Sequence, residues 1–193
     1  MAVASDDGYQ RFTYRDYRSW PEDERRELIE GVAWDMNPSP STSHQQILMA
    51  LFNIIYNFLR EKSCQVFIAP LDVRFPEDNE PDGEIESVVQ PDLFIVCDRT
   101  KMDDHGCKGA PDVIMEVLSP YTARKDMKEK LSLYEKVGVR EYWLIQPNDK
   151  TVMVYMRGKN GKYGRPAIYT EEDEVKIGIL ALRIDMEQVF QSQ

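Results

Sequence analysis

Two short apolar segments of this sequence each carry a carboxylate: Asp92 lies in residues 91–96, and Glu116 lies in residues 111–118. Segments of this length that are rich in β-branched and large apolar residues and begin with proline are typical of buried strands. Because side chains alternate along a strand, Glu116 is expected to point into a layer of apolar neighbours. Burying a charge without a partner is strongly unfavourable, so Glu116 requires a cation, a metal ion or a proton beside it.

A helical pattern over residues 121–137 supplies a candidate partner. Its apolar stripe consists of Met127, Leu131, Tyr134 and Val137. At about 100° per residue, Lys130 falls within this stripe. The other lysines of the segment fall outside it, namely Lys125, Lys128 and Lys136. Only Lys130 is therefore predicted to face inward, and Asp126, one turn earlier, is placed to orient its ammonium group.

Two carboxylates on adjacent strands and a lysine on the next helix indicate metal-dependent cleavage of a phosphodiester bond. In such sites oxygen ligands hold Mg²⁺ or Mn²⁺, and a lysine orients water or stabilises the charge of the transition state. Each residue also has a purely structural interpretation. Asp92 follows a proline, where aspartate often closes a turn, and Lys130 is able to form a simple ion pair with Asp126.

The same residues resemble the PD-(D/E)XK nuclease superfamily. Pro91-Asp92 matches its PD element, and Glu116 matches the acidic residue of the next core strand. The chain departs from the usual pattern, because Leu118 stands where a lysine is expected two positions after Glu116. The resemblance narrows to a branch of small restriction-endonuclease-like proteins in which the lysine has moved to the following helix. It extends through Glu27-Leu28-Ile29-Glu30-Gly31, Pro38, His44, Pro91-Asp92, Glu116-Val117-Leu118-Ser119, Asp126, Lys130, Tyr134 and Gly138-Val139-Arg140-Glu141-Tyr142-Trp143.

The resemblance implies an α/β (α+β) fold, with a mixed β-sheet core flanked by helices and with additional β-hairpins. It implies Mg²⁺ or Mn²⁺ as the cofactor, DNA as the substrate, and a homodimer whose two sites address two strands. The implied metal ligands are Asp92, Glu116, the carbonyl of Val117, and Glu27. The implied catalytic residues are Asp92, Glu116, Lys130 and Glu27, with His44 and Asp126 in support.

Glu27 and His44 each leave an alternative open. Residues 27–36 are predicted to form a strand or a strand-like turn around Gly31, in which Glu27 fits the resemblance better than Glu30. A surface acid paired with a neighbouring arginine is an equally good interpretation of Glu27. His44 lies on the buried stripe of a helix predicted over residues 43–62, where a neutral imidazole would hydrogen-bond a water or a phosphate; a histidine that caps its own loop is the alternative.

Length and composition predict one domain over residues 1–193, with a flexible tail at residues 1–8. The chain has 193 residues, of which 42% are hydrophobic, enough for one sizeable core. Three cysteines without C-x-x-C spacing suggest neither a disulfide framework nor a zinc site, which fits a reducing cytoplasm. No apolar segment approaches the roughly 20 residues that span a bilayer, so we expect a cytoplasmic protein without a membrane partner.

The charge of the chain argues against a broad electrostatic grip on nucleic acid. The formal net charge is −10, whereas nucleic-acid binding depends on many phosphate contacts from lysine and arginine. Two local basic clusters soften this argument: Arg124, Lys125, Lys128, Lys136 and Arg140, and Arg157, Lys159, Lys162 and Arg165. Two other functions therefore remain open. One is a catalytically idle, nuclease-like interaction module, and the other is a metal-dependent hydrolase of a small phosphorylated molecule.

Overall fold

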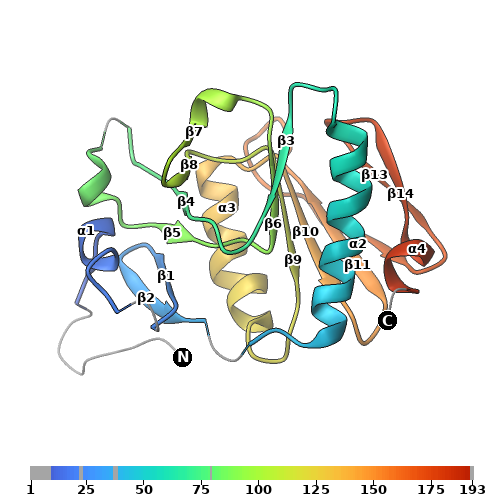
Figure 1. Cartoon of the computed structure of the whole chain (residues 1–193), viewed down its shortest axis with the longest axis horizontal. Coiled ribbons are helices and arrows are strands. Elements are labelled where there is room, and N and C mark those ends of the chain that lie inside the picture. Colours follow the sequence, from blue (N-terminus) through green and yellow to red (C-terminus); the bar gives the residue numbers. More distant parts are fainter. Residues whose placement is uncertain (1–9, 22–23, 37–38, 79, 192–193) are drawn as a thin grey trace.

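A mixed six-stranded sheet with helices on both faces forms the centre of the molecule (Figure 1). The computed structural model describes residues 10–21, 24–36, 39–78 and 80–191, so the predicted tail at residues 1–8 lies outside the described residues. The sheet has the order β12-β11-β10-β9-β6-β3. Its strands are β3 (Gln65–Ile68), β6 (Leu93–Val96), β9 (Val113–Val117), β10 (Glu141–Gln146), β11 (Thr151–Met156) and β12 (Ala167–Thr170).

The register of this sheet positions the two carboxylates predicted for the site. Strand β9 pairs in parallel with β10 and antiparallel with β6, and the remaining pairs are antiparallel, which confirms the mixed sheet. Leu93 of β6 pairs with Met115 of β9. Asp92, one residue before β6, therefore comes opposite Glu116.

Helix α2 (Thr42–Leu59) covers one face of the sheet, as predicted from the pattern over residues 43–62. Ser41 begins the helix by accepting a hydrogen bond from the backbone N–H of His44, at 3.2 Å. The inward side of α2 consists of His44, Ile47, Leu48, Leu51, Ile55 and Leu59. These apolar side chains pack on the same core as Met115, Val117 and Trp143 of the sheet.

Helix α3 (Leu131–Val137) covers the opposite face and is preceded by a π-helical segment, η3 (Lys125–Lys130). A π-turn has i→i+5 hydrogen bonds, so its side chains do not follow the 100° spacing of an α-helix. The predicted orientations of two residues are therefore wrong. Lys125 is buried instead of lying outside the inward face, and Met127 is 45% exposed instead of lying in the core.

A second sheet, of order β2-β1-β5-β4-β8-β7, lies beside the first. Its strands are β1 (Arg26–Ile29), β2 (Val32–Asp35), β4 (Val73–Arg74), β5 (Val88–Val89), β7 (Met102–Asp103) and β8 (Gly106–Lys108). Strands β1 and β2 form the hairpin expected around Gly31, where Glu30 and Gly31 both have positive φ. This hairpin carries Glu27 toward the central sheet.

The remaining elements close the domain at its two ends. Strands β13 (Glu174–Ile177) and β14 (Leu182–Asp185) form a hairpin that leads into α4 (Met186–Phe190), and these elements pack on the α2 side of the core. At the other end lie α1 (Tyr14–Tyr17) and two 3₁₀ turns, η1 (Asp82–Glu84) and η2 (Arg99–Lys101). Every helix of the described residues is too short or too polar to cross a membrane.

A disulfide joins Cys64 to Cys97, and Cys107 is free and buried. The expectation of no disulfide is therefore wrong. Cys64 precedes β3 and Cys97 follows β6, and the antiparallel pairing of these strands sets the two cysteines opposite each other. Strand register, rather than sequence spacing, decides this pairing. Because disulfides are uncommon in a reducing cytoplasm, the cysteines no longer support a cytoplasmic location.

Candidate functional site

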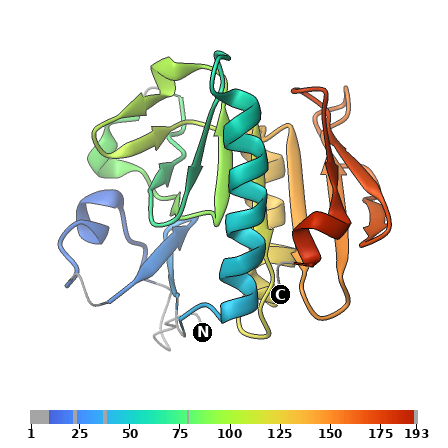
Figure 2. The same cartoon turned by 45° about the vertical axis from the view of Figure 1, so that its right-hand side comes forward.

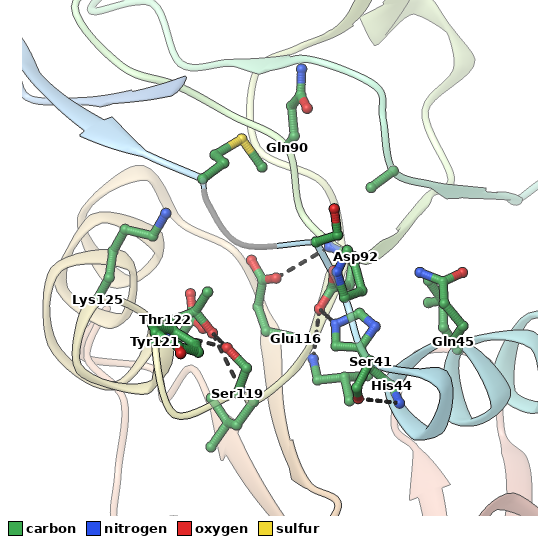
Figure 3. A pocket seen from close by; sticks show the side chains of 18 of the residues that line it. Ser41, His44, Gln45, Gln90, Asp92, Glu116, Ser119, Tyr121, Thr122 and Lys125 are labelled. Carbon is green, nitrogen blue, oxygen red and sulfur yellow. Dashed lines mark hydrogen bonds and ion pairs between the residues drawn. The ribbon is translucent and has the colours of Figure 1, made fainter. Parts of the chain in front are cut away.

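A cavity of about 470 Å³ opens where β6 begins and β9 ends (Figure 3). It lies between the first turns of α2, the π-helical segment η3, and the hairpin of β1 and β2. All six predicted catalytic residues line it: Glu27, His44, Asp92, Glu116, Asp126 and Lys130. The fold thus brings together residues that are spread over about a hundred positions of the sequence.

Three hydrogen bonds join Asp92 to His44, Glu116 and Val117. Its Oδ2 atom accepts from the backbone N–H of Val117, at 2.8 Å, and lies 3.0 Å from Nε2 of His44. Its own backbone N–H donates to Oε2 of Glu116, at 3.2 Å. Figure 3 shows the result: the Glu116 side chain reaches the backbone of Asp92, and the His44 ring approaches Asp92 from α2.

His44 therefore belongs to the site rather than to a cap of its own loop. Because a carboxylate only accepts hydrogen bonds, Nε2 of His44 carries the proton in this contact. Its Nδ1 atom is buried and has no hydrogen-bond partner among the described residues. The imidazole thus orients Asp92 and leaves Oδ1 of Asp92 without a hydrogen-bond donor in the described part of the chain.

Glu116 lies almost fully buried between the sheet and α3. Its Oε1 atom accepts from Nζ of Lys130, at 2.8 Å, and from the hydroxyl of Tyr134, at 3.0 Å. Burial raises the pKa of Glu116 to about 8, and the carboxylates of Asp126 and Asp92 add to this effect while Lys130 opposes it. Glu116, the strand-interior acid predicted to need a partner, is thus paired with Lys130.

Lys130 forms the centre of the charged groups. Its Nζ atom lies 2.8 Å from Oε1 of Glu116, 2.9 Å from Oε1 of Glu27, and 3.6 Å from Oδ1 of Asp126. Burial alone would lower the pKa of Lys130, but these carboxylates outweigh it and hold the pKa well above its usual value. Lys130 is therefore a fixed positive charge and does not act as a base.

Glu27 is fully buried, which rules out the interpretation as a surface acid. Its Oε2 atom binds Nζ of Lys125, and its Oε1 atom accepts from the backbone N–H of Gln90, at 2.9 Å, as well as from Lys130. Burial would raise the pKa of Glu27, but the two ammonium groups outweigh it and lower the pKa to about 2. Glu30, the alternative, is exposed and pairs with Lys136 outside this cavity.

Lys125 is the residue of the site that the sequence prediction missed. Its side chain is only 8% exposed and is committed to Glu27. The signal in the sequence is the five-residue interval from Lys125 to Lys130, which matches the i→i+5 hydrogen-bond spacing of a π-helix; both ammonium groups contact Glu27. At the roughly 100° per residue of an α-helix, Lys125 and Lys130 would instead lie on different sides, so the prediction placed Lys125 outside the site.

Asp126 and the preceding loop complete the arrangement. Asp126 is buried, and burial raises the pKa of its carboxyl group although Lys130 opposes the shift. Its backbone carbonyl accepts a hydrogen bond from the hydroxyl of Tyr142, at 3.1 Å. Ser119 and Thr122 bond to each other through their hydroxyls, at 3.1 Å, and so begin the helical segment.

The donor set of the cavity fits a hard divalent cation. Four carboxyl groups line it, those of Glu27, Asp92, Glu116 and Asp126, together with the cations Arg25, Lys125 and Lys130. Carboxylate oxygen is the ligand that Mg²⁺ and Mn²⁺ prefer, and Mg²⁺ often takes only one or two carboxylates beside water and substrate. Among the described residues, no three side chains of His, Cys, Asp or Glu form a complete metal site. An ion bound in this cavity would need water or substrate to complete its coordination.

The fold and the site together define a restriction-endonuclease-like α/β protein. Residues 14–187 match the Uma2 family, which is described as "Putative restriction endonuclease". The chain belongs to this family.

A crystal structure from Anabaena variabilis ATCC 29413 has a similar fold. It is described as a "putative nuclease belonging to DUF820", and the TM-score is 0.74 at 21% sequence identity, with 94% of this chain and 98% of that chain covered. No curated protein matches the chain.

Proposed function

We propose that this protein hydrolyses DNA phosphodiester bonds as an endonuclease that depends on Mg²⁺ or Mn²⁺. The observation that carries the proposal is the contact between Asp92 and Glu116. The Asp92 side chain accepts from the backbone N–H of Val117, the Glu116 side chain accepts from the backbone N–H of Asp92, and Lys130 binds Glu116. Membership of the Uma2 family supports the reaction class.

Asp92 and Glu116 would hold the ion, together with the carbonyl of Val117. When bound, such an ion polarises the phosphate and lowers the pKa of coordinated water. Glu27, a metal ligand in the sequence-based hypothesis, has both oxygens engaged by Lys125, Lys130 and Gln90. We therefore assign Glu27 to holding the two lysines in position.

The remaining residues orient the reacting groups. Lys130, as a fixed cation, orients the attacking water and stabilises the negative charge that develops on the phosphate. Asp126 restrains the ammonium group of Lys130, and His44 fixes the rotamer of Asp92. Tyr134 donates to Glu116 and so limits its carboxylate to one orientation.

DNA is the substrate that the family favours, and the cavity also suits a second candidate. Several cations of the two basic clusters are paired with acids: Lys136 with Glu30, Lys162 with Glu135. These pairs weaken the attraction for a long phosphate backbone. A small phosphorylated molecule needs no such surface, so metal-dependent hydrolysis of that class is the second candidate.

Cleavage of supercoiled plasmid DNA with Mg²⁺ or Mn²⁺ tests the proposal. We expect nicked and linear products from the wild type, and a loss of at least about 100-fold in rate for Lys130→Met, because its charge acts on the transition state. Lys136→Met is the matched control on the exposed side of the same helix and should cleave at the wild-type rate. Equal rates for Lys130→Met and wild type would contradict the assigned role. Intact DNA together with hydrolysis of a phosphorylated small molecule would favour the second candidate.

A further inference from the structure

The groups proposed to carry the chemistry lie at the floor of the cavity, away from the surface of the molecule. Glu116 and Lys130 are each 3% exposed, and Asp126 is 2% exposed. The side chain of Asp92 is 20% exposed and is the most accessible of the proposed metal ligands. A phosphodiester group must therefore enter the cavity to reach these residues.

The rim of the cavity differs from its floor in charge. Among the described residues, the exposed ones that line the cavity are serines, prolines, a glutamine, an asparagine, one tyrosine and one arginine. Arg25 is thus the single charged residue of the rim. Proteins that hold duplex DNA place many lysines and arginines against its phosphates. A rim with one cation indicates substrate binding that is not mainly electrostatic.

Tyr121 provides another means of binding at this rim. Its side chain is 73% exposed, the highest value among the large hydrophobic side chains of the described residues. It makes no hydrogen bond, ion pair or ring contact within the described part of the chain. Figure 3 shows Tyr121 on the η3 side of Glu116 and His44 on the α2 side. A free aromatic ring beside a phosphate-binding cavity is a surface on which a nucleobase stacks.

The loop that carries Tyr121 lies at the edge of the molecule. It joins β9 to η3 over residues 118–124. Figures 1 and 2 both show this loop at the lower edge, beside the amino-terminal end of α2. The hydrogen bond between the hydroxyls of Ser119 and Thr122, at 3.1 Å, braces the backbone on both sides of Tyr121. The ring therefore projects from a restrained loop next to the cavity.

We propose that the cavity takes an unpaired DNA strand, with a base stacked on Tyr121 and a phosphate bound by Arg25. This inference rests on the proposed function and adds the state of the substrate. A cavity of about 470 Å³ encloses one small molecule, which corresponds to a single nucleotide unit. A base inside a duplex is already paired and stacked, so it must leave the duplex to stack on Tyr121. Negatively supercoiled plasmid opens locally and therefore remains a substrate.

Cleavage of one fluorescent oligonucleotide, supplied as a single strand and as a duplex with Mn²⁺, tests the proposal. We expect the wild type to cut the single strand at least tenfold faster than the duplex. Tyr121→Ala should raise the KM for the single strand about tenfold and leave kcat nearly unchanged, because the ring holds a base and touches no reacting atom. Tyr121→Phe keeps the ring and should restore the wild-type KM.

The matched control is Tyr56→Ala, because Tyr56 is 50% exposed on α2 and does not line the cavity. This variant should keep the wild-type KM and kcat. Equal rates on the single strand and the duplex, or an unchanged KM for Tyr121→Ala, would overturn the inference. Neither result would contradict the proposed nuclease activity, since DNA is cleaved in both.

Fluorescence anisotropy of the same oligonucleotides tests the inference independently of cleavage. A protein that cleaves no nucleic acid would contradict the proposed function, and binding would still be measurable. With Ca²⁺ in place of Mn²⁺, we expect the wild type to bind the single strand at least tenfold more tightly than the duplex. Tyr121→Ala should lose this preference. Equal binding of the two forms by the wild type would contradict the inference.

The salt dependence of this binding tests the role of Arg25. One phosphate contact on a single strand predicts a slope of about −0.7 for log affinity against log salt concentration. Arg25→Gln should bring the slope toward zero while Tyr121→Ala leaves it unchanged. A wild-type slope as steep as about −3, which corresponds to roughly four phosphate contacts, would overturn a binding mode that depends on stacking.

Discussion

Glu116 and Glu141 are two buried glutamates on neighbouring strands of the central sheet, β9 and β10, and their surroundings differ in kind. Glu116 faces a cavity and binds an ammonium group and a phenol. Glu141 is enclosed, and its oxygens accept from Nε1 of Trp143, at 2.7 Å, and from the backbone N–H of Gly178, at 2.9 Å. No cation among the described residues contacts it.

The difference separates an acid that we propose to be functional from one that is structural. Burial raises the pKa of both carboxyl groups, so burial by itself does not separate them. Both donors to Glu141 are neutral, and the backbone N–H of Gly178 ties β10 to the segment after β13. Glu116 adjoins Asp92 and open volume, which are conditions that favour a bound cation. The following predictions use this contrast.

The largest expected effect on stability follows from removing the cation beside Glu116. Lys130→Met leaves three buried carboxylates with one ammonium group fewer, so we expect a loss of about 3–5 kcal/mol in the free energy of unfolding. Lys136→Met, whose pairs are exposed, should lose about 1 kcal/mol or less. Urea denaturation of both variants measures the difference. Similar losses would contradict a large contribution of the buried ion pairs of Lys130 to stability.

The pH dependence of stability should separate the two glutamates next. Because the folded-state pKa of Glu116 is raised to about 8 from 4.5, the native state holds a proton that the unfolded state releases above pH 4.5. Stability should therefore fall as the pH rises from about 5 to 8, by at most about 1.4 kcal/mol per pH unit for one proton.

Glu116→Gln should reduce this fall and leave the contributions of Asp126 and Glu141, whose pKa values are also raised, as measured by urea denaturation across the pH range. Glu27 does not contribute to it, since its lowered pKa affects stability only below pH 4.5. Glu141→Gln serves as the comparison and should leave the Glu116 contribution in place. A wild-type profile that stays level from pH 5 to 8 would contradict the assignment of a raised pKa to Glu116.

The smallest effect concerns the phenol that contacts Glu116. Tyr134→Phe keeps the ring in the core and removes one hydrogen bond to the carboxylate, so we expect a loss of about 1–2 kcal/mol. The control is Tyr155→Phe, because the Tyr155 hydroxyl has no hydrogen-bond partner among the described residues. It should change stability by about 0.5 kcal/mol or less. Thermal denaturation of the two variants compares them directly. Equal shifts of the Tm would contradict a stabilising hydrogen bond from Tyr134 to Glu116.

Local patterns in the sequence were sufficient to predict much of the fold. Period-two runs and the apolar stripe of residues 43–62 predicted the central strands and α2, because each element buries its own face. The pairing of Asp92 with Glu116 was also predictable, since adjacent apolar strands bring successive acids together. The family match and the mixed fold confirm the predicted family and fold class.

The rest depends on information that a linear pattern does not contain. The π-turn at η3 changes the angle per residue, so Lys125 and Met127 were assigned to the wrong sides. The Cys64–Cys97 disulfide depends on the register of β3 and β6. For Glu27, the sequence left a residue of the site and a surface acid equally plausible. Only the tertiary contact of its hairpin with η3 decides between them.

Calorimetric titration of Mn²⁺ tests most directly whether the cavity at Glu116 is a metal site. The account predicts binding to the wild type that is lost in Glu116→Gln and retained in Glu141→Gln. Binding at pH 7 should also release a proton, because Glu116 must ionise to act as a ligand, and buffers of different ionisation enthalpy would detect this. Equal binding to wild type and Glu116→Gln, or no binding to the wild type, would contradict the central claim.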